Sequence, residues 1–410
     1  MKIKLTFLFV LWLTICIFNP IGAEPQKKIS RSRDIDRKNT EVILPAETDI
    51  TSKLSLVLGC PTDKSVVVSI LSAEKIDGYI EYGTSSGNYT HKTNTVSVTA
   101  GKPTEIVLDK LDANTRYFYR LISRKQGQAW LISPPEYSFH TQRSPGSTFT
   151  FAIQGDSHPE RRQQHDPELY ARTLLNAASD HPDFYMTIGD DFSVDTLRTV
   201  KAETVTQRYI IQRPFLGLVA HSAPLFLVNG NHEQAAACNL DGTPNNVAVW
   251  AQTARNLYYR QPAPDGFYTG DTKPVEYIGL LRDYYAWTWG DALFVVIDPY
   301  WHSAIPVDNV FGGGDKRKDM WAVTLGDAQF QWFKQTLEQS PAKYKFVFTH
   351  HVLGTGRGGI ENAGLFEWGG KNNKGQSEFP QKRPNWEMPI HQLMARNGVT
   401  IFVTVQALGA

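Results

Sequence analysis

Cysteine is scarce in this sequence. Only three cysteines occur among 410 residues, which excludes a fold built mainly from disulfide bonds. Cys16 lies in an apolar run at the amino terminus. The other two, Cys60 and Cys238, could form one disulfide in an oxidising compartment, and the sequence leaves their pairing open.

An excess of charge of one sign is also absent. Lys and Arg number 42 against 41 Asp and Glu, for a formal net charge of +1. Loss of residues 1–23 would remove Lys2 and Lys4 and leave a nearly neutral chain. Because neither nucleic acid nor an anionic membrane favours a neutral surface, we expect neither as a partner.

No hydrophobic run beyond the amino terminus approaches the length of a membrane span. Residues 1–23 combine two lysines, an apolar run over 5–18 and small residues at 22–23. This pattern predicts a secretory signal peptide, and so a secreted or periplasmic protein with no stable membrane insertion after cleavage. An uncleaved membrane anchor is the alternative.

The rest of the chain is long enough for two domains. Residues 24–50 are polar and lack apolar periodicity, which predicts a linker. Residues 51–143 contain short β-rich runs separated by turn residues, a spacing typical of a β-sandwich. This region holds no cluster of His or carboxylate residues, so we expect it to be a scaffold.

Residues 148–410 alternate apolar strands with helical segments, which indicates an α/β domain. Asp166 is a candidate N-cap followed by proline at the first helical position. Phe330, Phe333 and Leu337 share the spacing of one helix face. Gly398 follows another predicted helix end.

Four strands of this region are apolar and then change abruptly to polar residues: TFTFAIQGDSH, DFYMTIGDD, LFLVNGNHE and YKFVFTHH. In open α/β sheets, ligands bind beyond the carboxyl ends of the strands. Carboxylate and imidazole donors together suit Zn, Mn or Fe better than Ca or Mg. The strand ends therefore predict a transition-metal site.

Each of these motifs also has an ordinary structural interpretation. Asp156 and His158 could be a hydrogen-bonded pair in a loop, and GDD could be a solvated turn in which Asp191 touches no metal. THH could be a surface strand end. Four such endings in one domain, each after an apolar strand, favour the metal site over coincidence.

The motifs GDSH, GDD, GNHE and THH resemble those of the calcineurin-like metallophosphoesterase superfamily. The preceding β-rich region, with LDANTRY similar to the tyrosine corner of fibronectin type III-like domains, resembles the purple-acid-phosphatase-like secreted branch, as does LGDAQFQWFKQTL. The resemblance implies a fibronectin type III-like β-sandwich followed by an α/β domain of two sheets flanked by helices. It also implies hydrolysis of phosphomonoesters or phosphodiesters, with a small phosphate ester as substrate.

The resemblance further implies a centre of two divalent or trivalent transition metal ions, Fe, Mn or Zn. Carried onto this sequence, the ligands are Asp156 and His158 for the first metal, Asn231 and His350 for the second, and Asp190 as the bridge. His232 would lie near the leaving oxygen as a proton donor or transition-state stabiliser, whereas Glu233 is expected to be structural.

Two departures from the family pattern stand out. Purple acid phosphatases carry a metal-binding tyrosine shortly after the second motif, where this sequence has Phe192 and Ser193. We therefore expect no iron–tyrosinate colour, and the metal identity stays open. The family also closes its site with Gly-His-x-His, whereas GVTIF is followed here by VTVQALGA.

That second departure leaves each metal with three expected ligand contacts, counting Asp190 for both. It predicts a truncated or frame-shifted form of a longer metallophosphoesterase. Two alternatives remain: a catalytically impaired cell-envelope binding protein, and a two-metal hydrolase acting on amides or other esters. The oligomeric state is left open by the sequence.

Overall fold

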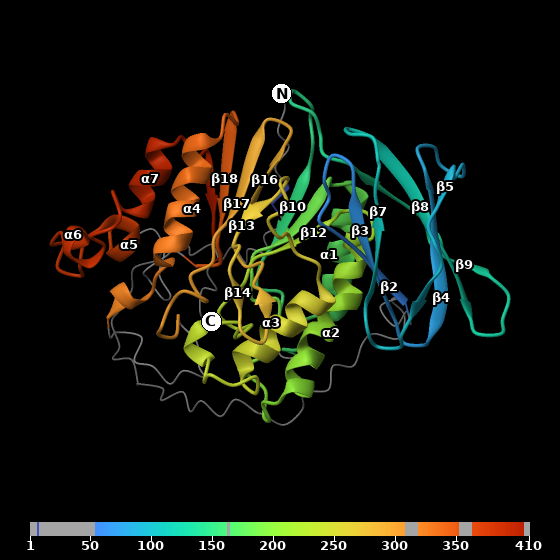
Figure 1. Cartoon of the computed structure of the whole chain (residues 1–410), viewed down its shortest axis with the longest axis horizontal. Coiled ribbons are helices and arrows are strands. Elements are labelled where there is room, and N and C mark those ends of the chain that lie inside the picture. Colours follow the sequence, from blue (N-terminus) through green and yellow to red (C-terminus); the bar gives the residue numbers. More distant parts are fainter. Residues whose placement is uncertain (1–5, 8–53, 162–164, 308–318, 352–362, 406–410) are drawn as a thin grey trace, which may run out of the picture.

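The computed structural model describes residues 6–7, 54–161, 165–307, 319–351 and 363–405. The predicted signal peptide and linker therefore lie outside the described residues, except for the two residues of β1 (Thr6–Phe7). A β-rich part and an α/β part lie side by side (Figure 1). Within the described ranges, no helix combines the length and the apolar composition that a membrane span needs.

The β-rich part consists of two antiparallel sheets. One has the order β2 (Leu54–Gly59), β3 (Val66–Ser72) and β7 (Thr104–Leu108). The other has the order β5 (His91–Lys92), β4 (Ile76–Gly83), β8 (Arg116–Lys125) and β9 (Leu131–His140), with β6 (Val96–Val98) also paired to β4.

Side chains from both of these sheets form one apolar core. Leu58 and Val68 come from the first sheet and Ile80 and Tyr119 from the second, and all four are fully buried. Alternate residues of a strand point to opposite faces, so each strand contributes every second side chain to the core. The Tyr117 hydroxyl accepts a hydrogen bond from the Asp112 amide at 2.9 Å, which fixes the chain between β7 and β8.

The first sheet of the α/β part is entirely parallel. Its order is β1, β10 (Phe151–Gln154), β11 (Phe184–Thr187) and β12 (Leu225–Leu227). Three helices pack on its outer face: α1 (Pro167–Ser179), α2 (Ala202–Ala220) and α3 (Val247–Tyr258). All three described strand pairs are parallel, so their carboxyl ends meet at one edge of the sheet.

The second sheet has the order β13 (Thr269–Gly270), β16 (Tyr285–Trp289), β17 (Ala292–Val296), β18 (Tyr344–Phe348) and β19 (Ile401–Val403). Strands β17, β18 and β19 run parallel. Its outer face is covered by α4 (Gly326–Gln339), α5 (Phe366–Gly369), α6 (Phe379–Lys382) and α7 (Ile390–Arg396). Strands β14 (Pro274–Val275) and β15 (Gly279–Leu280) pair as a separate two-stranded antiparallel sheet. Two short 3-10 helices, η2 (Ala237–Asn239) and η3 (Met320–Ala322), lie outside the sheets.

The space between these two sheets is filled mainly by aromatic rings. Phe294 of β17 stacks on Phe346 at 5.1 Å between ring centroids and meets Phe151 of the first sheet edge to face, also at 5.1 Å. Phe184 and Trp287 meet across the same space at 5.7 Å. Aromatic pairs of this geometry stabilise a core beyond simple burial. The layers are therefore helices, sheet, sheet and helices.

The predicted helix ends and helix face are confirmed. Asp166 caps α1 by accepting hydrogen bonds from the amides of Glu168 and Leu169, both at 3.0 Å. The predicted buried face of α4, made by Phe330, Phe333 and Leu337, has no exposed surface. Gly398 follows α7 with a φ of +65°, a conformation that favours glycine.

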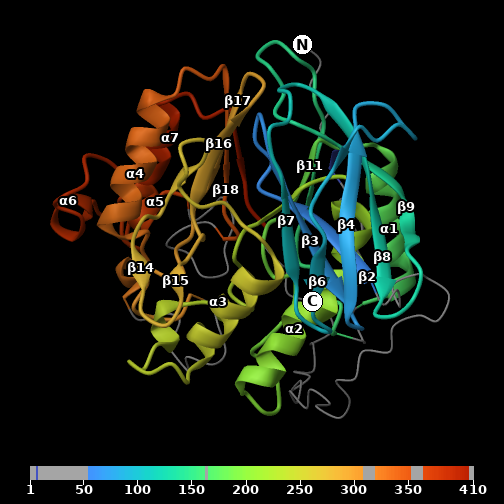
Figure 2. The ribbon, with the colours of Figure 1, turned by 45° about the vertical axis from the view of Figure 1, so that its right-hand side comes forward.

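Helix α2 of the α/β part packs beside β2 of the β-rich part (Figure 2). From within this helix, Arg213 donates to the Ser69 carbonyl at 2.7 Å and to its hydroxyl at 3.0 Å. Beyond the helix end, the His221 carbonyl accepts from the Tyr119 hydroxyl at 2.6 Å. Buried polar contacts of this kind fix one part against the other.

Cys60 and Cys238 do not form a disulfide with each other. Burial raises the pKa of the Cys60 thiol to about 12, and its sulfur lies 3.9 Å from the Arg260 carbonyl oxygen. The described structure therefore holds no disulfide between them.

Candidate metal centre

The four polar motifs follow β10, β11, β12 and β18, at the carboxyl ends of the two facing sheets. Glycines allow the motif turns to touch. A Cβ added at Gly189 would lie 2.7 Å from the backbone of Gly230, and one added at Gly230 would lie 2.3 Å from Asp190 Oδ1. No larger residue fits at either position without moving backbone.

The backbone is strained where the site forms. Asp156, His158 and Asp190 have φ values of +51°, +38° and +54°. Residues other than glycine occupy this left-handed region at an energetic cost, and such residues cluster at functional sites. These three residues are the ones in the GDSH and GDD segments whose side chains belong to the candidate metal groups.

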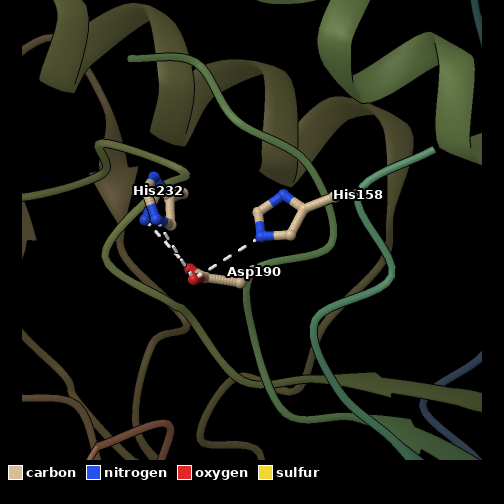
Figure 3. Close-up of side chains that lie close together, drawn as sticks. All are labelled: His158, Asp190 and His232. Atoms are coloured by element: carbon tan, nitrogen blue, oxygen red, sulfur yellow. Dashed lines mark hydrogen bonds and ion pairs between the residues drawn. The ribbon is translucent and has the colours of Figure 1, made fainter. Parts of the chain in front are cut away.

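Asp190 lies at the centre of the site (Figure 3). Its Oδ2 atom is 3.7 Å from His158 Nε2 and 3.7 Å from His232 Nε2, the pairs drawn there. The same oxygen is 3.3 Å from His350 Nε2. Its other oxygen, Oδ1, accepts a hydrogen bond from the His232 amide at 3.0 Å. One carboxylate thus meets three imidazoles from both sheets.

Two groups of donor atoms are compact enough to hold a metal ion. His158, Asp190 and His232 form one, and Asp156, Asp190 and His350 form the other, each with ligand atoms within 4.8 Å of one another. Asp190 is common to both groups. Asn231 is 3% exposed and lies between Gly230 and His232, both of which contact Asp190.

The donors fit transition-metal ions. Both carboxylate oxygens of Asp156 and the Nε2 atom of His350 are buried without a hydrogen-bond partner among the described residues. A buried carboxylate without donors is costly, and native structures normally satisfy such atoms with a hydrogen bond, water or an ion. Carboxylate oxygen and imidazole nitrogen together are the ligands that Zn, Mn and Fe accept.

The electrostatics of the site favour bound cations. Burial opposes ionisation of Asp190, yet the charge of His350 and the hydrogen bond from His158 hold the pKa of this carboxyl well below its usual range. Burial likewise opposes charge on His350, but Asp190 and Asp156 raise its pKa to about 10. The site therefore retains positive charge strongly, and metal ions can replace these protons.

Each imidazole is oriented through its Nδ1 atom. His350 Nδ1 bonds the Ile188 carbonyl at 2.8 Å. His232 Nδ1 lies 2.8 and 2.9 Å from the two oxygens of Asp195. These contacts place the proton on Nδ1 and leave Nε2 facing Asp190, the arrangement in which a histidine can bind a metal.

His158 has two partners at Nδ1. The Ser193 hydroxyl lies 3.1 Å away and Glu160 Oε1 lies 3.5 Å away. Burial would lower the pKa of His158, but its interactions with the Asp190 and Glu160 carboxylates, which accept from the ring, raise that pKa to about 9. Glu160 also accepts from the Ser193 amide at 2.7 Å, so it holds both the ring and the neighbouring turn.

Two further carboxyl groups support the turns. Glu233 accepts hydrogen bonds from the Asp191 amide at 2.7 Å and the Gly230 amide at 3.0 Å. Burial, together with the charge of Asp190, raises its pKa well above the usual value. The Asp191 carboxylate accepts from the Thr187 hydroxyl at 2.6 Å, and burial raises its pKa to about 6. Both carboxyl groups therefore bond to the surrounding chain.

Sequence reasoning did not identify two residues that contact the candidate ligands. Glu160 comes two positions after His158 in GDSHPE, so its nearness to the metal motif was a usable signal. Asp195 lies in SVDTL, an irregular segment with no motif of its own. Its pairing with His232 depends on how two loops meet.

The α/β part therefore has two facing sheets between helices, with carboxylate and imidazole residues at their common edge. Solved structures of other proteins are similar to this chain. A structure of PhoD has a TM-score of 0.51 and 16% sequence identity, and the match covers 73% of this chain and 62% of that one.

A second similar structure is the purple acid phosphatase PPD1 from yellow lupin (Lupinus luteus) seeds. Its TM-score is 0.55 at 17% identity, and the match covers 85% of this chain and 57% of the lupin chain. This chain therefore spans about three fifths of the length of either neighbour. No protein-family model and no curated protein sequence matches the chain. At these identities the likeness establishes a shared fold.

Proposed function

We propose that this protein is a metal-dependent phosphoesterase that hydrolyses phosphomonoesters or phosphodiesters. The observation that carries the proposal is the meeting of three imidazoles on one Asp190 oxygen, beside an Asp156 carboxylate whose oxygens have no hydrogen-bond partner among the described residues. Metal binding explains why buried carboxylate oxygens without hydrogen-bond partners lie next to three imidazoles.

The proposed ligands are those expected from the sequence. Asp156 and His158 would hold one metal, Asn231 and His350 the other, and Asp190 would bridge them. The compact donor groups pair these residues differently, since His158 lies with His232 and Asp156 lies with His350, and only Asp190 is common to both. Asp190 suits that role because its Oδ1 atom is engaged by the His232 amide, which leaves Oδ2 to face the imidazoles. Fe, Mn and Zn all accept this donor set, so the pair of ions is proposed only as transition metals.

When bound, the two ions would supply Lewis acidity toward the phosphoryl oxygens and lower the pKa of a water molecule. The chain's own residues hold this chemistry in place. Ile188 and Asp195 fix the rings of His350 and His232, and the GDD and GNHE turns meet through Gly230. Ligand side chains that are already held in place reduce the reorganisation that the reaction requires.

His232 is proposed to donate a proton to the leaving oxygen. Its Nδ1 atom is bound to Asp195 and its Nε2 atom faces the site, so a proton on Nε2 would point toward a bound ester. An Nε2–H group in that position could act as the general acid.

The remaining assignments concern location and architecture. We propose that residues 1–23 direct secretion or periplasmic export, and that residues 51–143 form a fibronectin type III-like scaffold. The support for the scaffold is the pair of antiparallel sheets with one shared core and the hydrogen bond between Tyr117 and Asp112. Arg213 and Tyr119 tie this scaffold to α2.

Purified protein would test the enzymatic proposal. We expect bound transition metal, and turnover of an aryl phosphate monoester or diester that is lost in Asp190→Ala. The matched control is Asp183→Ala, which removes another buried carboxylate, one bonded to Arg143 at the opposite end of β11. A panel including amide and carboxylic ester substrates would reveal a different hydrolase. Turnover no higher than that of Asp190→Ala would refute the proposal.

A catalytically impaired binding protein is the second candidate. The observation that favours it is the small number of donors among the described residues: each of the two candidate groups has three, and Asp190 is common to both. On this hypothesis the β-rich part makes the contact. Absence of both metal and turnover in a folded protein would favour it.

A further inference from the structure

The candidate ligands come from two different sheets. Asp156, His158, Asp190 and Asn231 follow strands of the first sheet, whereas His350 follows β18 of the second. The metal proposed to bind Asn231 and His350 therefore depends on how the two sheets are placed against each other. An interaction that joins the edges of the two sheets would therefore set the distance between Asn231 and His350.

Such an interaction is present beside the site. Asn229 follows β12 of the first sheet, and its amide nitrogen donates to Asp298 Oδ2 at 2.6 Å; Asp298 follows β17 of the second sheet. Asn229 is 1% exposed and Asp298 is 0% exposed. Both partners are buried, so losing this short hydrogen bond would leave a buried polar group without a partner, which is costly.

Asp298 is itself held rigidly. Its amide donates to Gln329 Oε1 at 2.8 Å, and its carbonyl accepts from Gln329 Nε2 at 2.6 Å. Its second carboxylate oxygen accepts from the Tyr300 amide at 2.6 Å. Gln329 lies on α4 and is fully buried. Helix α4 therefore positions Asp298, and Asp298 positions Asn229.

Movement of Asn229 would reach the metal ligands directly. The next residue is Gly230, which is packed against Asp190 so closely that an added Cβ would lie 2.3 Å from the Asp190 amide nitrogen. Asn231 and His232 follow in the same turn. A shift of this turn toward or away from the second sheet would change the separation of Asn231 from His350.

We propose that Asp298 is a positioning residue for the metal centre, which sets the GNHE turn at the correct distance from the strand end that carries His350. The inference rests on the proposed two-metal function. With the proposed pairing of ligands, it predicts an asymmetric effect, because Asp156 and His158 both follow β10 of the first sheet, as Asp190 follows β11, and these three do not depend on the Asp298–Asn229 hydrogen bond.

The test is a calorimetric titration of metal-free protein with Mn²⁺. We expect the parent to bind two ions, and Asp298→Ala to weaken one of them by about 10- to 100-fold, the usual effect of losing a residue that supports a metal ligand. The other site should stay within about threefold of the parent. Asp183→Ala is the matched control, since it removes a buried carboxylate far from the ligands and should leave both sites unchanged.

Two more variants guard against misfolding. Asn229→Ala removes the same hydrogen bond but leaves Asp298 bound to Tyr300 and Gln329, and should reproduce the selective loss. Asp298→Asn should restore near-parental binding. The side-chain carbonyl of the new asparagine can still accept from the Tyr300 amide. Its NH₂ group can donate to Asn229 Oδ1 once the Asn229 side-chain amide rotates, since that oxygen has no hydrogen-bond partner in the described part of the chain.

The outcomes separate the two proposals. Parental affinity at both sites in Asp298→Ala and Asn229→Ala would overturn the positioning role while leaving the metal centre intact. Equal weakening of both sites in these variants and in Asp183→Ala would overturn it too, because the effect would then be general destabilisation. A parent that binds no Mn²⁺ would contradict the proposed function and remove the positioning role with it.

Discussion

The space between the two sheets of the α/β part differs sharply along the strands. At the beginning and middle of the strands, Phe151, Phe184, Trp287, Phe294 and Phe346 form a buried aromatic core. At the carboxyl ends of the same strands, carboxylates and imidazoles replace them. Along one strand, residues that stabilise the fold lie only a few positions from residues that are candidate metal ligands. A substitution in the aromatic core should therefore lower stability without removing the metals, and a substitution at the strand ends should do the reverse.

The largest effect is expected at the strand ends. Asp190→Ala removes the oxygen that meets three imidazoles, so both metals should lose a ligand and hydrolysis should fall by about 10³-fold or more. Steady-state rates and metal analysis measure this, with unfolding followed in parallel. Substantial turnover in the variant would contradict the claim that the strand ends carry the chemistry.

The next effect is expected in the middle of the strands. Phe294 is fully buried and contacts Phe151, Phe346 and Trp287, so Phe294→Ala should lower the free energy of unfolding by about 3–5 kcal/mol. Chemical denaturation measures the loss. Turnover per folded molecule and metal content should stay close to the parent, and a variant that folds well but loses its metals would contradict the separation.

A smaller effect is expected behind the site. Asp195→Asn keeps the shape that holds His232 but removes the negative charge, so kcat should fall by about 10- to 100-fold. The metal content should be unchanged. Asp180→Asn, on the exposed end of α1, is the matched control. If both variants keep the parental kcat, the Asp195 charge has no role in catalysis.

The junction with the β-rich part offers a pH test away from the metals. Burial lowers the pKa of His221 from 6.5 to about 4, and its ring stacks on Tyr137 at 3.9 Å. A histidine that is harder to protonate when folded contributes stability above pH 6.5, and this contribution is lost as the pH falls toward 4. The loss can reach about 1.4 kcal/mol per pH unit.

His221→Phe keeps a ring for Tyr137 and takes up no proton. Denaturant unfolding at several values between pH 7 and pH 4 should therefore show a shallower decline for the variant than for the parent. The metal ligands are common to both proteins, so the difference between the two slopes isolates His221. Identical slopes would show that His221 is protonated equally well in the folded and unfolded chains.

The smallest effect is expected at the start of α1. Asp166 caps two amides of this helix, and Asp166→Ala should lower the free energy of unfolding by about 1 kcal/mol. Chemical denaturation measures it, and Asp166→Asn should recover most of the loss. Equal stability of all three proteins would mean that the cap is replaced by water.

Local patterns in the sequence predicted much of this arrangement. Asp166, followed by proline, marked the start of α1, and the apolar-to-polar change after β10, β11, β12 and β18 marked the edge where the candidate ligands meet. These features are carried by neighbouring residues, so capping and strand polarity are enough to find them.

Contacts between distant segments could not be predicted in the same way. Asn229 and Asp298 are 69 positions apart, and their hydrogen bond exists only because two sheets face each other. Asp195 reaches His232 from an irregular loop whose path depends on the packing around it. Neither pair leaves a periodic or local signal, since tertiary packing determines both.

Anomalous X-ray diffraction from crystals grown with Mn²⁺ tests the central claim most directly. The account expects two anomalous peaks about 3.5–4 Å apart, with Asp190 between them, one near His158 and the other near His350. A folded protein that shows no peak at Asp190, or binds its metal elsewhere, would contradict it.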